Sequence, residues 1–340
     1  MYRIDQYPAS ASSCLLLLLA LGLASASSAK VSRQAHLMGT TFTIIVGDEI
    51  TEARAEQVMD GAFKEVARIE SLMSEWLPNS EISNINGNAG RLPTKVSVET
   101  MNVLSTALNV SRLSKGAFDP TWACLRGLWS FKDENPRLPK RSELLRRLKS
   151  VDYNKIIVSE TDRTIYLAES GMALGLGAIA KGYAIDRVKE LLRGQGIKNF
   201  IIDGGGDLHA SGRKPDGPWT VGIRHPRQAE LLVEFPIRDR SIVTSGDYER
   251  FFMMGSRRYH HILDLKTGMP ARNSVSVTIL ADDAIFADAI ATAVFVMGPA
   301  DGLKLVDSMS GVDAIILAPD GRIHRSARLR LNLPDRWRPN

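Results

Sequence analysis

Two stretches of the chain combine residue types and spacings that suit a metal-bound phosphate. The first, residues 174–186, reads L-G-L-G-A-I-A-K-G-Y-A-I-D and follows an expected strand at 164–168. Glycine lets a ligand approach the backbone closely, and free N–H groups at the start of a helix attract anions. Lys181 adds a positive charge. The pattern indicates a phosphate-binding turn, although glycine-rich turns between a strand and a helix also occur as plain architecture.

The second stretch, residues 284–297, is apolar on nearly all sides and predicts a buried helix. Asp288 and Thr292 are its only polar side chains, and their i, i+4 spacing places both on one face. A carboxylate in such a helix is costly unless it is paired or binds a cation. Asp and Thr oxygens suit Mg²⁺, which keeps several waters and takes phosphate oxygens from its ligand. The alternative is an Asp that accepts a hydrogen bond from a nearby backbone N–H.

Other candidate side chains lie on expected loops and turns. Trp76 follows a long helix and would either cover the edge of the core or stack on a flat ligand ring. Asp119, beside Phe118, would either hydrogen-bond a ligand or form a turn before Pro120. His260 and His261 are adjacent on an expected strand, so their side chains point to opposite faces and one of them is a candidate base.

Regular elements must position these residues. Apolar periodicity predicts helices at 51–73, 97–114, 142–148 and 284–297, and β-branched runs predict strands at 40–46, 199–202 and 274–280. A hairpin is expected at 155–168, and strands at 219–223, 230–237 and 241–244 are expected to form an antiparallel meander. Helices gather early and strands dominate later, which is typical of an α+β fold.

Composition narrows the class of protein. The chain has 340 residues, 44% hydrophobic and 24% charged, which is typical of a globular protein. The formal net charge is +5, but the basic residues are scattered apart from a modest cluster at 140–149. Aromatic residues are not interleaved with them, so we expect no nucleic-acid partner.

The N-terminus predicts export. Residues 1–26 contain Arg3, an apolar run at 14–23 and small residues at 24–26, as in a cleaved signal peptide. The apolar run is too short to span a bilayer comfortably, so we expect no transmembrane span in the mature chain. Cys14 precedes the leucines, which argues against a lipid anchor at the cleavage point. Cys124 is then the only cysteine of the mature chain and is expected to be a buried small hydrophobe.

Seven short motifs follow one another along the chain: M-G-T at 38–40, S-E-I-S-N-I-N at 80–86, G-A-F-D-P at 116–120, L-G-A-I-A-K-G-Y-A-I-D at 176–186, S-G-D-Y at 245–248, H-I-L-D-L-K-T-G-M-P at 261–270 and A-D-A-I-A-T-A at 287–293. In this order they resemble the FAD:protein FMN transferases, the ApbE family. The resemblance covers almost the whole mature chain.

The resemblance implies a function, a location and a fold. The family uses Mg²⁺ to transfer FMN from FAD to a Thr hydroxyl of a partner protein, and it releases AMP. The partners are typically flavin subunits of membrane redox complexes that face the periplasm, with which the signal peptide agrees. The implied fold is α+β, with antiparallel sheets and packed helices in two closely joined lobes and FAD in the cleft between them. We expect one such domain at 35–325 and a C-terminal tail at 326–340.

The resemblance also assigns roles to residues. His261 is implied as the base that activates the target Thr. Asp288, Thr292 and the backbone carbonyl of Ala178 are implied as metal ligands. The implied FAD contacts are Met38, Trp76, Ala117, Phe118, Asp119, Lys181 and Ile262.

Departures from the family pattern leave alternatives open. Many members have an Asp that contacts the flavin nucleotide where this chain has Gly175, many have Tyr in place of Trp76, and Leu265 replaces the usual Pro. Many are lipoproteins, whereas this chain is expected to be a soluble periplasmic form. The alternative functions are a Mg²⁺-dependent FAD pyrophosphatase, with water as acceptor, and a non-catalytic periplasmic FAD-binding protein.

Overall fold

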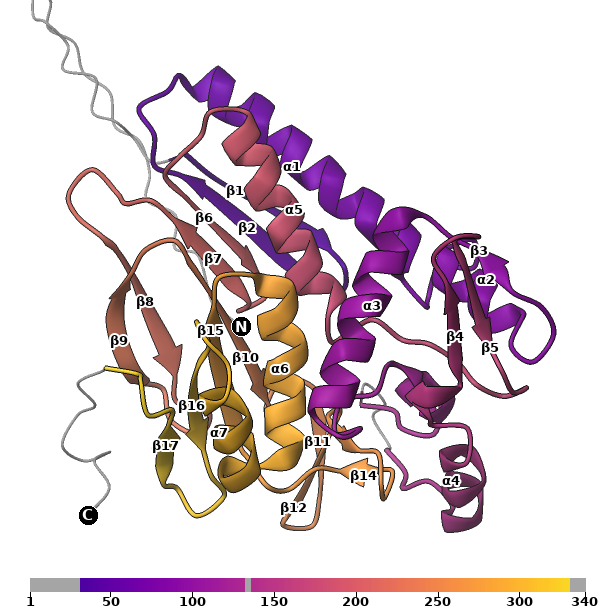
Figure 1. The fold of residues 1–340 in the computed structure, drawn as a ribbon. Coiled ribbons are helices and arrows are strands. Elements are labelled where there is room, and N and C mark those ends of the chain that lie inside the picture. The colour runs from indigo at the N-terminus through magenta and orange to yellow at the C-terminus, as the bar shows by residue number, and fades with distance from the viewer. Residues whose placement is uncertain (1–30, 132–135, 331–340) are drawn as a thin grey trace, which may run out of the picture.

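A single large antiparallel sheet forms the frame of the molecule. The computed structural model describes residues 31–131 and 136–330, and Figure 1 shows the sheet behind a layer of helices. Its strand order is β1-β2-β6-β7-β10-β15-β16-β17. Its strands are β1 (Val31–Leu37), β2 (Thr40–Val46), β6 (Phe200–Gly204), β7 (Leu208–Ser211), β10 (Arg240–Gly246), β15 (Ser276–Ala281), β16 (Asp313–Leu317) and β17 (Ile323–Arg325). The signal-peptide prediction lies outside the described residues.

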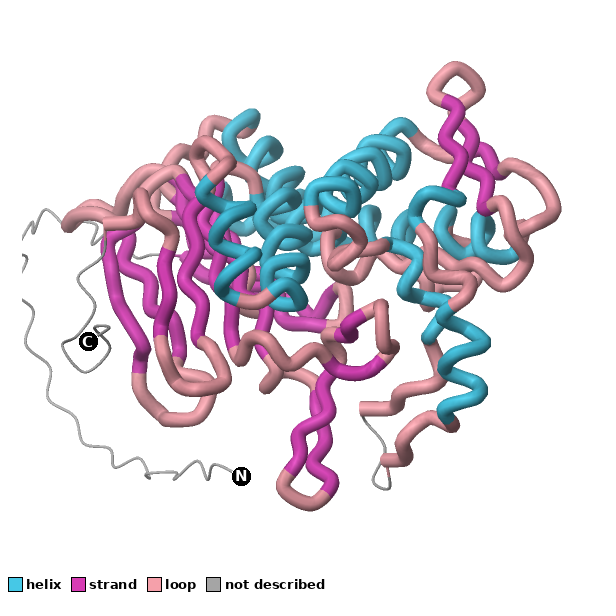
Figure 2. The backbone as a smooth tube through the Cα atoms, turned by 60° about the horizontal axis from the view of Figure 1, so that its bottom comes forward, coloured by secondary structure: helices cyan, strands magenta, loops and turns pink. Residues whose placement is uncertain are grey.

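Helices cover one face of this sheet, as Figures 1 and 2 show. They are α1 (Glu52–Met73), α3 (Val98–Leu113), α5 (Ala180–Gly194), α6 (Ala284–Met297) and α7 (Pro299–Asp307). The expected helices are confirmed, and α6 has the predicted bounds. Thr51 accepts a hydrogen bond from the N–H of Arg54 and caps α1. Within the described residues, no helix combines the length and apolar character needed to cross a membrane.

A smaller lobe adjoins the helical layer. It contains α2 (Glu81–Gly87), a short 3₁₀ helix (Pro120–Leu125), α4 (Arg141–Leu148) and a three-stranded sheet in the order β3-β5-β4. Its strands are β3 (Thr94–Lys95), β4 (Ile156–Ser159) and β5 (Thr164–Leu167), of which β4 and β5 form the predicted hairpin. One hydrophobic core runs through both lobes, since Ile82 and Ile165 belong to the same buried cluster as Ile279. The α+β fold with two closely joined lobes is therefore confirmed.

The central sheet is buried on both faces. Alternate residues of β10 illustrate this, because Val243 packs in the core beneath the helices and Ile242 in a second core. A hairpin of β8 (Trp219–Arg224) and β9 (Leu231–Ile237) supplies half of the buried residues of that second core. The predicted meander is therefore wrong: β9 pairs with β8, whereas β10 pairs with β7 and β15. The apolar side chains of β8 and β9 are used in packing against the sheet rather than in extending it.

The packed chain continues past the predicted end of the domain at 325. The Ser326 N–H donates to the Ala314 carbonyl at 3.0 Å, and Ser326 is 1% exposed. Leu329 is buried in the second core. Residues 326–330 are therefore part of the folded domain rather than of a tail. Hydrogen bonds between Ser326 and the backbone of Ala314 in β16 hold this segment in place.

The N-terminal ends of α5 and α6 meet in front of the sheet and cap each other (Figure 1). Asp288 of α6 accepts from the Gly182 N–H at 3.1 Å. In return, Asp186 of α5 accepts from the N–H groups of Ala284 and Ile285, at 3.0 and 2.8 Å. Each carboxylate thus satisfies donors that the facing helix leaves unpaired, and its negative charge suits the positive end of that helix.

Gly182→Ala tests how tightly this crossing is packed. A Cβ at Gly182 would lie 2.2 Å from the Ala284 carbonyl oxygen. Because the obstacle is backbone, one helix must shift, and overpacking of this kind costs roughly 1–3 kcal/mol. We expect the free energy of unfolding, measured in urea, to fall by that amount. The matched variant Gly194→Ala, near the open end of α5 with nothing within 4 Å of its Cβ position, should leave it nearly unchanged. Equal effects would contradict the close crossing.

His209 predicts a pH dependence of stability. The side chain is 1% exposed on β7, and its Nδ1 lies 2.9 Å from Ser241 Oγ. Burial, with help from Lys189 and Arg193, lowers its pKa to about 3. The pKa is about 6.5 in the unfolded chain. Above that pH the buried, neutral ring of His209 causes no loss of stability. As the pH falls from there towards 3, the free energy of unfolding decreases by roughly 1.4 kcal/mol per pH unit, because only the unfolded chain takes up the proton.

Urea unfolding at about pH 7.5 and about pH 5 measures this effect. We expect the wild-type chain to lose roughly 2 kcal/mol more stability between the two pH values than His209→Asn does. Asn keeps a polar partner for Ser241 but does not titrate. An equal loss in both proteins would show that His209 is not the responsible group.

Candidate functional site

A buried charged cluster lies where α5 and α6 cross. Lys181 forms ion pairs with Asp207 and with Asp288, the latter at 3.5 Å from Nζ to Oδ2. Asp207 and Asp288 are 4% and 3% exposed. Burial alone would lower the pKa of Lys181, but the two carboxylates outweigh it and raise that pKa. The cluster therefore holds a charged ammonium group between two acidic side chains.

Asp207 is a member of this cluster that the sequence did not single out. It ends the D-G-G-G-D run at 203–207, whose glycines permit either a close backbone approach or a tight turn. Its Oδ1 accepts from the Thr244 N–H at 3.3 Å, which fixes the carboxylate against β10. Its burial becomes visible only in the fold, where a buried acid needs a cationic partner.

Asp288 fulfils the structural alternative with one of its two carboxylate oxygens, and its metal role stays a prediction. Its Oδ2 accepts from the Gly182 backbone, so the structural alternative is correct for that oxygen. Its Oδ1 accepts no hydrogen bond within the part of the chain that the structure describes. Burial raises the pKa of Asp288 to about 6, and Lys181 opposes that rise. An additional cation at Oδ1 would stabilise the ionised carboxylate further.

The other predicted metal ligands fit a hard cation. Thr292 lies one turn after Asp288 on α6, and its Oγ1 is 3.4 Å from Ser245 Oγ. Ala178 lies two residues before α5, and its carbonyl accepts no hydrogen bond among the described residues. The donors are thus carboxylate, hydroxyl and carbonyl oxygens, the set that Mg²⁺ prefers. No group of three or more His, Cys, Asp or Glu side chains suited to a metal occurs in the described ranges.

The facing helix satisfies part of the N–H groups at the start of α5. Ala180, Gly182 and Tyr183 donate to Leu176 O, Asp288 Oδ2 and Ile179 O, at 2.8, 3.1 and 3.1 Å. The Lys181 N–H donates to no acceptor among the described residues. That N–H and the Lys181 side chain are what this stretch can offer to a phosphate, and the phosphate-binding turn stays a prediction.

Met38 sits in a strained turn. It and Gly39 form the two-residue connection between β1 and β2, with φ of 52° and 71°. Two consecutive positive φ values define a type I′ turn, which is uncommon for an unbranched apolar residue such as Met. Met38 is half-buried against the main core. Strain of this kind is often retained where a side chain serves a ligand, which agrees with the predicted FAD contact.

Trp76 does not cover the core. Its side chain is 69% exposed, and the guanidinium of Arg126 lies 5.0 Å from the ring centroid. Arg126 is itself held by a hydrogen bond to the Glu75 carbonyl. Of the two alternatives for Trp76, only stacking on a ligand ring is compatible with the structure. The indole ring faces the solvent, where a flat ring system can stack on it.

The G-A-F-D-P segment is mainly structural in its visible contacts. Phe118 is 4% exposed and belongs to the main core, and Ala117 packs against it. Asp119 caps the 3₁₀ helix, since its Oδ1 accepts from the Thr121 N–H and hydroxyl at 2.8 and 2.6 Å. Its Oδ2 accepts from the Tyr153 N–H at 3.0 Å. The turn-forming alternative thus describes the carboxylate, and a contact with FAD stays a prediction for all three residues.

His260 and His261 face opposite ways, as expected. Strand β12 (Arg257–His260) ends at His260, which is 4% exposed, whereas the side chain of His261 is exposed. Surrounding protein and the positive charges of Arg250, His260 and Lys181 lower the pKa of His261. Water at the exposed side of the ring moderates that shift. His261 is therefore neutral near pH 7 and open to a substrate, while the neighbouring Ile262 is buried.

Gly175 is matched to Trp122. The Trp122 Nε1–H donates to the Gly175 carbonyl at 3.0 Å, and a Cβ at Gly175 would lie 2.8 Å from the indole ring. An Asp at this position would displace the ring. Trp122 thus occupies the space that a longer side chain at 175 would need.

Comparisons with known proteins agree with the resemblance seen in the sequence motifs. The sequence pattern of the ApbE family matches residues 38–316. FAD:protein FMN transferases of Treponema pallidum (strain Nichols) and Klebsiella pneumoniae (strain 342) are 34% and 33% identical to this chain; they cover 87% and 88% of it and 86% and 93% of their own lengths. The crystal structure of the ApbE protein from Thermotoga maritima matches with a TM-score of 0.80 at 33% identity, over 88% of this chain and 97% of that one. The chain belongs to the ApbE family.

Proposed function

We propose that this protein transfers FMN from FAD to the hydroxyl of a Thr in a partner protein, with Mg²⁺ as cofactor and AMP as the second product. Relatives of similar length carry the name FAD:protein FMN transferase. The observation that carries the proposal is the Lys181–Asp207–Asp288 cluster, in which a buried carboxylate keeps one oxygen free of internal hydrogen bonds. Such a site suits a metal ion together with a diphosphate.

The residues have distinct tasks in this proposal. Asp288, Thr292 and the Ala178 carbonyl would hold Mg²⁺, which when bound neutralises charge on the FAD diphosphate. Lys181 offers a further positive charge, and Asp207 keeps its ammonium group in place. Trp76 presents its exposed ring to the isoalloxazine.

His261 provides the base. Because its pKa is lowered, it is neutral near pH 7 and accepts the proton of the Thr hydroxyl. A bond then forms between the Thr oxygen and the phosphorus next to riboflavin, and the bond between that phosphorus and the bridging oxygen breaks. AMP departs with the bridging oxygen. Positioning and charge neutralisation account for most of the rate enhancement in such transfers.

The site of action belongs to the same proposal. The signal-peptide pattern of residues 1–26 supports export to the periplasm. The acceptors would be flavin subunits of membrane redox complexes that expose a target Thr there. Detection of the processed chain in a periplasmic fraction is the direct measurement.

The test is mass spectrometry of an acceptor subunit incubated with the protein, FAD and Mg²⁺. We expect a Thr-containing peptide to gain the mass of one FMN unit, in step with AMP release. Free FMN and AMP with an unmodified acceptor would instead identify a FAD pyrophosphatase. FAD that binds and stays intact would identify a non-catalytic flavin-binding protein.

A further inference from the structure

Arg250 is a positively charged residue beside the candidate site that has no partner in the described part of the chain. It comes directly before β11 (Phe251–Met254) and is exposed. Its guanidinium forms no ion pair and no hydrogen bond with the described residues. Most exposed arginines are simply solvated, so the position of Arg250 decides whether it has a function.

The backbone places Arg250 beside His261. Strand β11 pairs with β12 in antiparallel fashion along its whole length. The His261 N–H donates to the Arg250 carbonyl at 3.1 Å, which extends this ladder by one further pair. Residues directly opposite each other in such a ladder have Cα atoms about 5.5 Å apart and send their side chains to the same face. Arg250 and His261 are therefore neighbours on one face of the hairpin.

The guanidinium of Arg250 also reaches the turn between β1 and β2. Its Nη2 lies 3.8 Å from the position that a Cβ would take at Gly39. The same turn carries Met38, the predicted FAD contact with a positive φ. Arg250 thus extends from the proposed base towards a segment that is predicted to hold FAD.

Electrostatic effects agree with this position. Burial lowers the pKa of His261 most, and Arg250 is the largest charged influence in the same direction, with Lys181 acting more weakly. Burial raises the pKa of Glu75, the residue before Trp76, and Arg250 opposes that rise. Since charge interactions weaken with distance, Arg250 is near the base and near the residues beside the exposed indole.

The proposed reaction fixes where the phosphorus must lie. The Thr oxygen gives its proton to His261 and attacks the phosphorus next to riboflavin, so this oxygen lies between the imidazole ring and the phosphorus. A hydrogen bond and an attack distance of about 3 Å each place the phosphorus within roughly 6 Å of the ring. A side chain as long as that of Arg250, leaving the hairpin beside His261, can reach the oxygens of this phosphate.

We propose that Arg250 is a second catalytic residue, whose guanidinium binds the two non-bridging oxygens of the phosphate that is transferred with FMN. This role rests on the proposed function. The bond from the Thr oxygen to phosphorus forms, the bond to the bridging oxygen breaks, the proton goes to His261, and AMP leaves with the bridging oxygen. Arg250 stabilises the charge on the phosphoryl oxygens during this step with two parallel hydrogen bonds.

Single-turnover labelling of an acceptor by Arg250→Gln tests the proposal. At saturating FAD and Mg²⁺ we expect the rate to fall at least about hundredfold, since an arginine on a transferring phosphoryl group contributes roughly 10³–10⁵ in related reactions. The dissociation constant of FAD, from fluorescence titration, should rise less than about tenfold. Arg250→Lys keeps the charge without the paired hydrogen bonds and should recover only part of the rate. An unchanged rate at saturating FAD in Arg250→Gln would overturn the proposal.

The pH profile distinguishes a charge beside the base from structural damage. Arg250, His260 and Lys181 are the charged or titratable groups that lower the pKa of His261, so removal of Arg250 should raise that pKa. Because the base must be neutral, the pH of half-maximal rate should move upward in Arg250→Gln and stay near the wild-type value in Arg250→Lys. A profile that does not move in Arg250→Gln would place the guanidinium away from the base and overturn the proposal.

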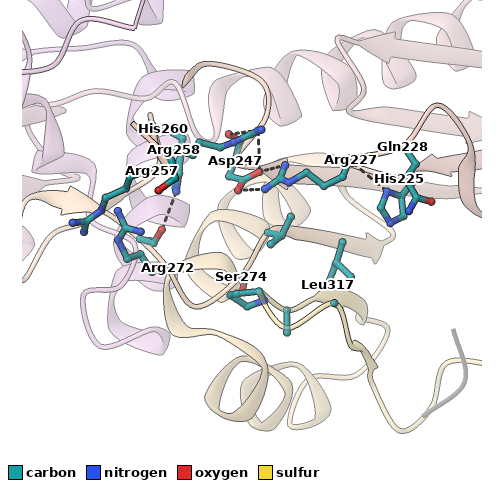
Figure 3. Close-up of a pocket in the computed structure, with 16 residues that line it drawn as sticks. His225, Arg227, Gln228, Asp247, Arg257, Arg258, His260, Arg272, Ser274 and Leu317 are labelled. Carbon is teal, nitrogen blue, oxygen red and sulfur yellow. Dashed lines mark hydrogen bonds and ion pairs between the residues drawn. The ribbon is translucent and has the colours of Figure 1, made fainter. Parts of the chain in front are cut away.

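Arg258→Gln is the matched control. Arg258 belongs to the same hairpin but shares the opposite face with His260, and Figure 3 shows it directed at Asp247, at 3.6 Å. Asp247 keeps Arg227 as a partner, at 2.8 Å. Removal of this charge should leave the rate and the pH profile unchanged. A loss equal to that in Arg250→Gln would show that the total charge of the hairpin matters and would overturn the specific role of Arg250.

The proposed function and the role of Arg250 fail in different ways. If the wild type labels the acceptor and Arg250→Gln does so equally fast, only the role of Arg250 is wrong. If the wild type releases AMP without labelling the acceptor, the transfer function is wrong. Water then attacks the same phosphorus, and the rate of AMP release by Arg250→Gln decides the role of Arg250 by the same hundredfold criterion.

Discussion

Asp288→Asn reduces Mg²⁺-dependent FMN transfer by at least about hundredfold and raises the Mg²⁺ concentration needed for half-maximal rate. The loss follows because a metal supplies several kcal/mol of charge stabilisation in the transition state, and each 1.36 kcal/mol is tenfold in rate. Asn is a fair replacement, since its carbonyl can still accept from the Gly182 N–H. The measurement is the initial rate of acceptor labelling over a Mg²⁺ titration. Undiminished activity would remove the metal assignment.

Asp186→Asn is the matched control. Asp186 has the same capping role as Asp288 at the same crossing, and it is also buried, at 8% exposed. Its cationic partner is Lys189, at 2.8 Å, rather than Lys181. We expect this variant to lose stability, seen as a lower Tm, with an unchanged Mg²⁺ requirement. A matching rise in the Mg²⁺ requirement in both variants would show that capping, not metal binding, explains the effect of Asp288→Asn.

The elements with strong periodicity could be predicted closely. Helix α6 has the predicted bounds, because its apolar run is bordered by polar residues on one side and Gly298 on the other. The caps at Thr51 and Ser80 followed from local chemistry, since a hydroxyl there accepts a backbone N–H three residues on. These features depend on neighbours in sequence and need no knowledge of the fold.

The order of the strands could not be predicted in the same way. Strand β10 lies between β7 and β15, although the sequence places β9 immediately before it. Strand pairing depends on which apolar faces are buried against each other. The apolar face of the 219–237 hairpin suits both a place in the sheet beside β10 and a place packed against the face of that sheet. The cross-capping of Asp186 and Asp288 is hidden for the same reason, because its donors lie about 100 residues away along the chain.

The candidate site was partly visible in the sequence. Asp288, Thr292 and Lys181 stood out because polar groups in apolar or glycine-rich surroundings require an explanation. Asp207 and Ser245 did not, since each is an ordinary turn or strand-end residue until the fold brings it to α5 or α6. Asp119 shows the opposite case: its motif was recognised, but its carboxylate is occupied by Thr121 and Tyr153.

His261→Ala leaves FAD binding nearly unchanged and lowers transfer by roughly 10²–10⁴-fold, the usual contribution of a general base. His261 is an exposed residue outside the strands, so its removal should disturb the fold little. In the wild type, the transfer rate should rise with pH through the lowered pKa of His261 and be level near neutrality. In the variant that rise should be absent.

His260→Gln separates the two neighbouring histidines. His260 is buried and donates to the Ala271 carbonyl, and a Gln at this position can still donate to it, so His260→Gln should preserve transfer. His261→Ala should abolish it. The readouts are single-turnover acceptor labelling and fluorescence titration of FAD on the same preparations. A His261→Ala enzyme with wild-type turnover would rule out His261 as the base. Loss of transfer in His260→Gln, with normal stability, would point to His260 instead of His261 as the base.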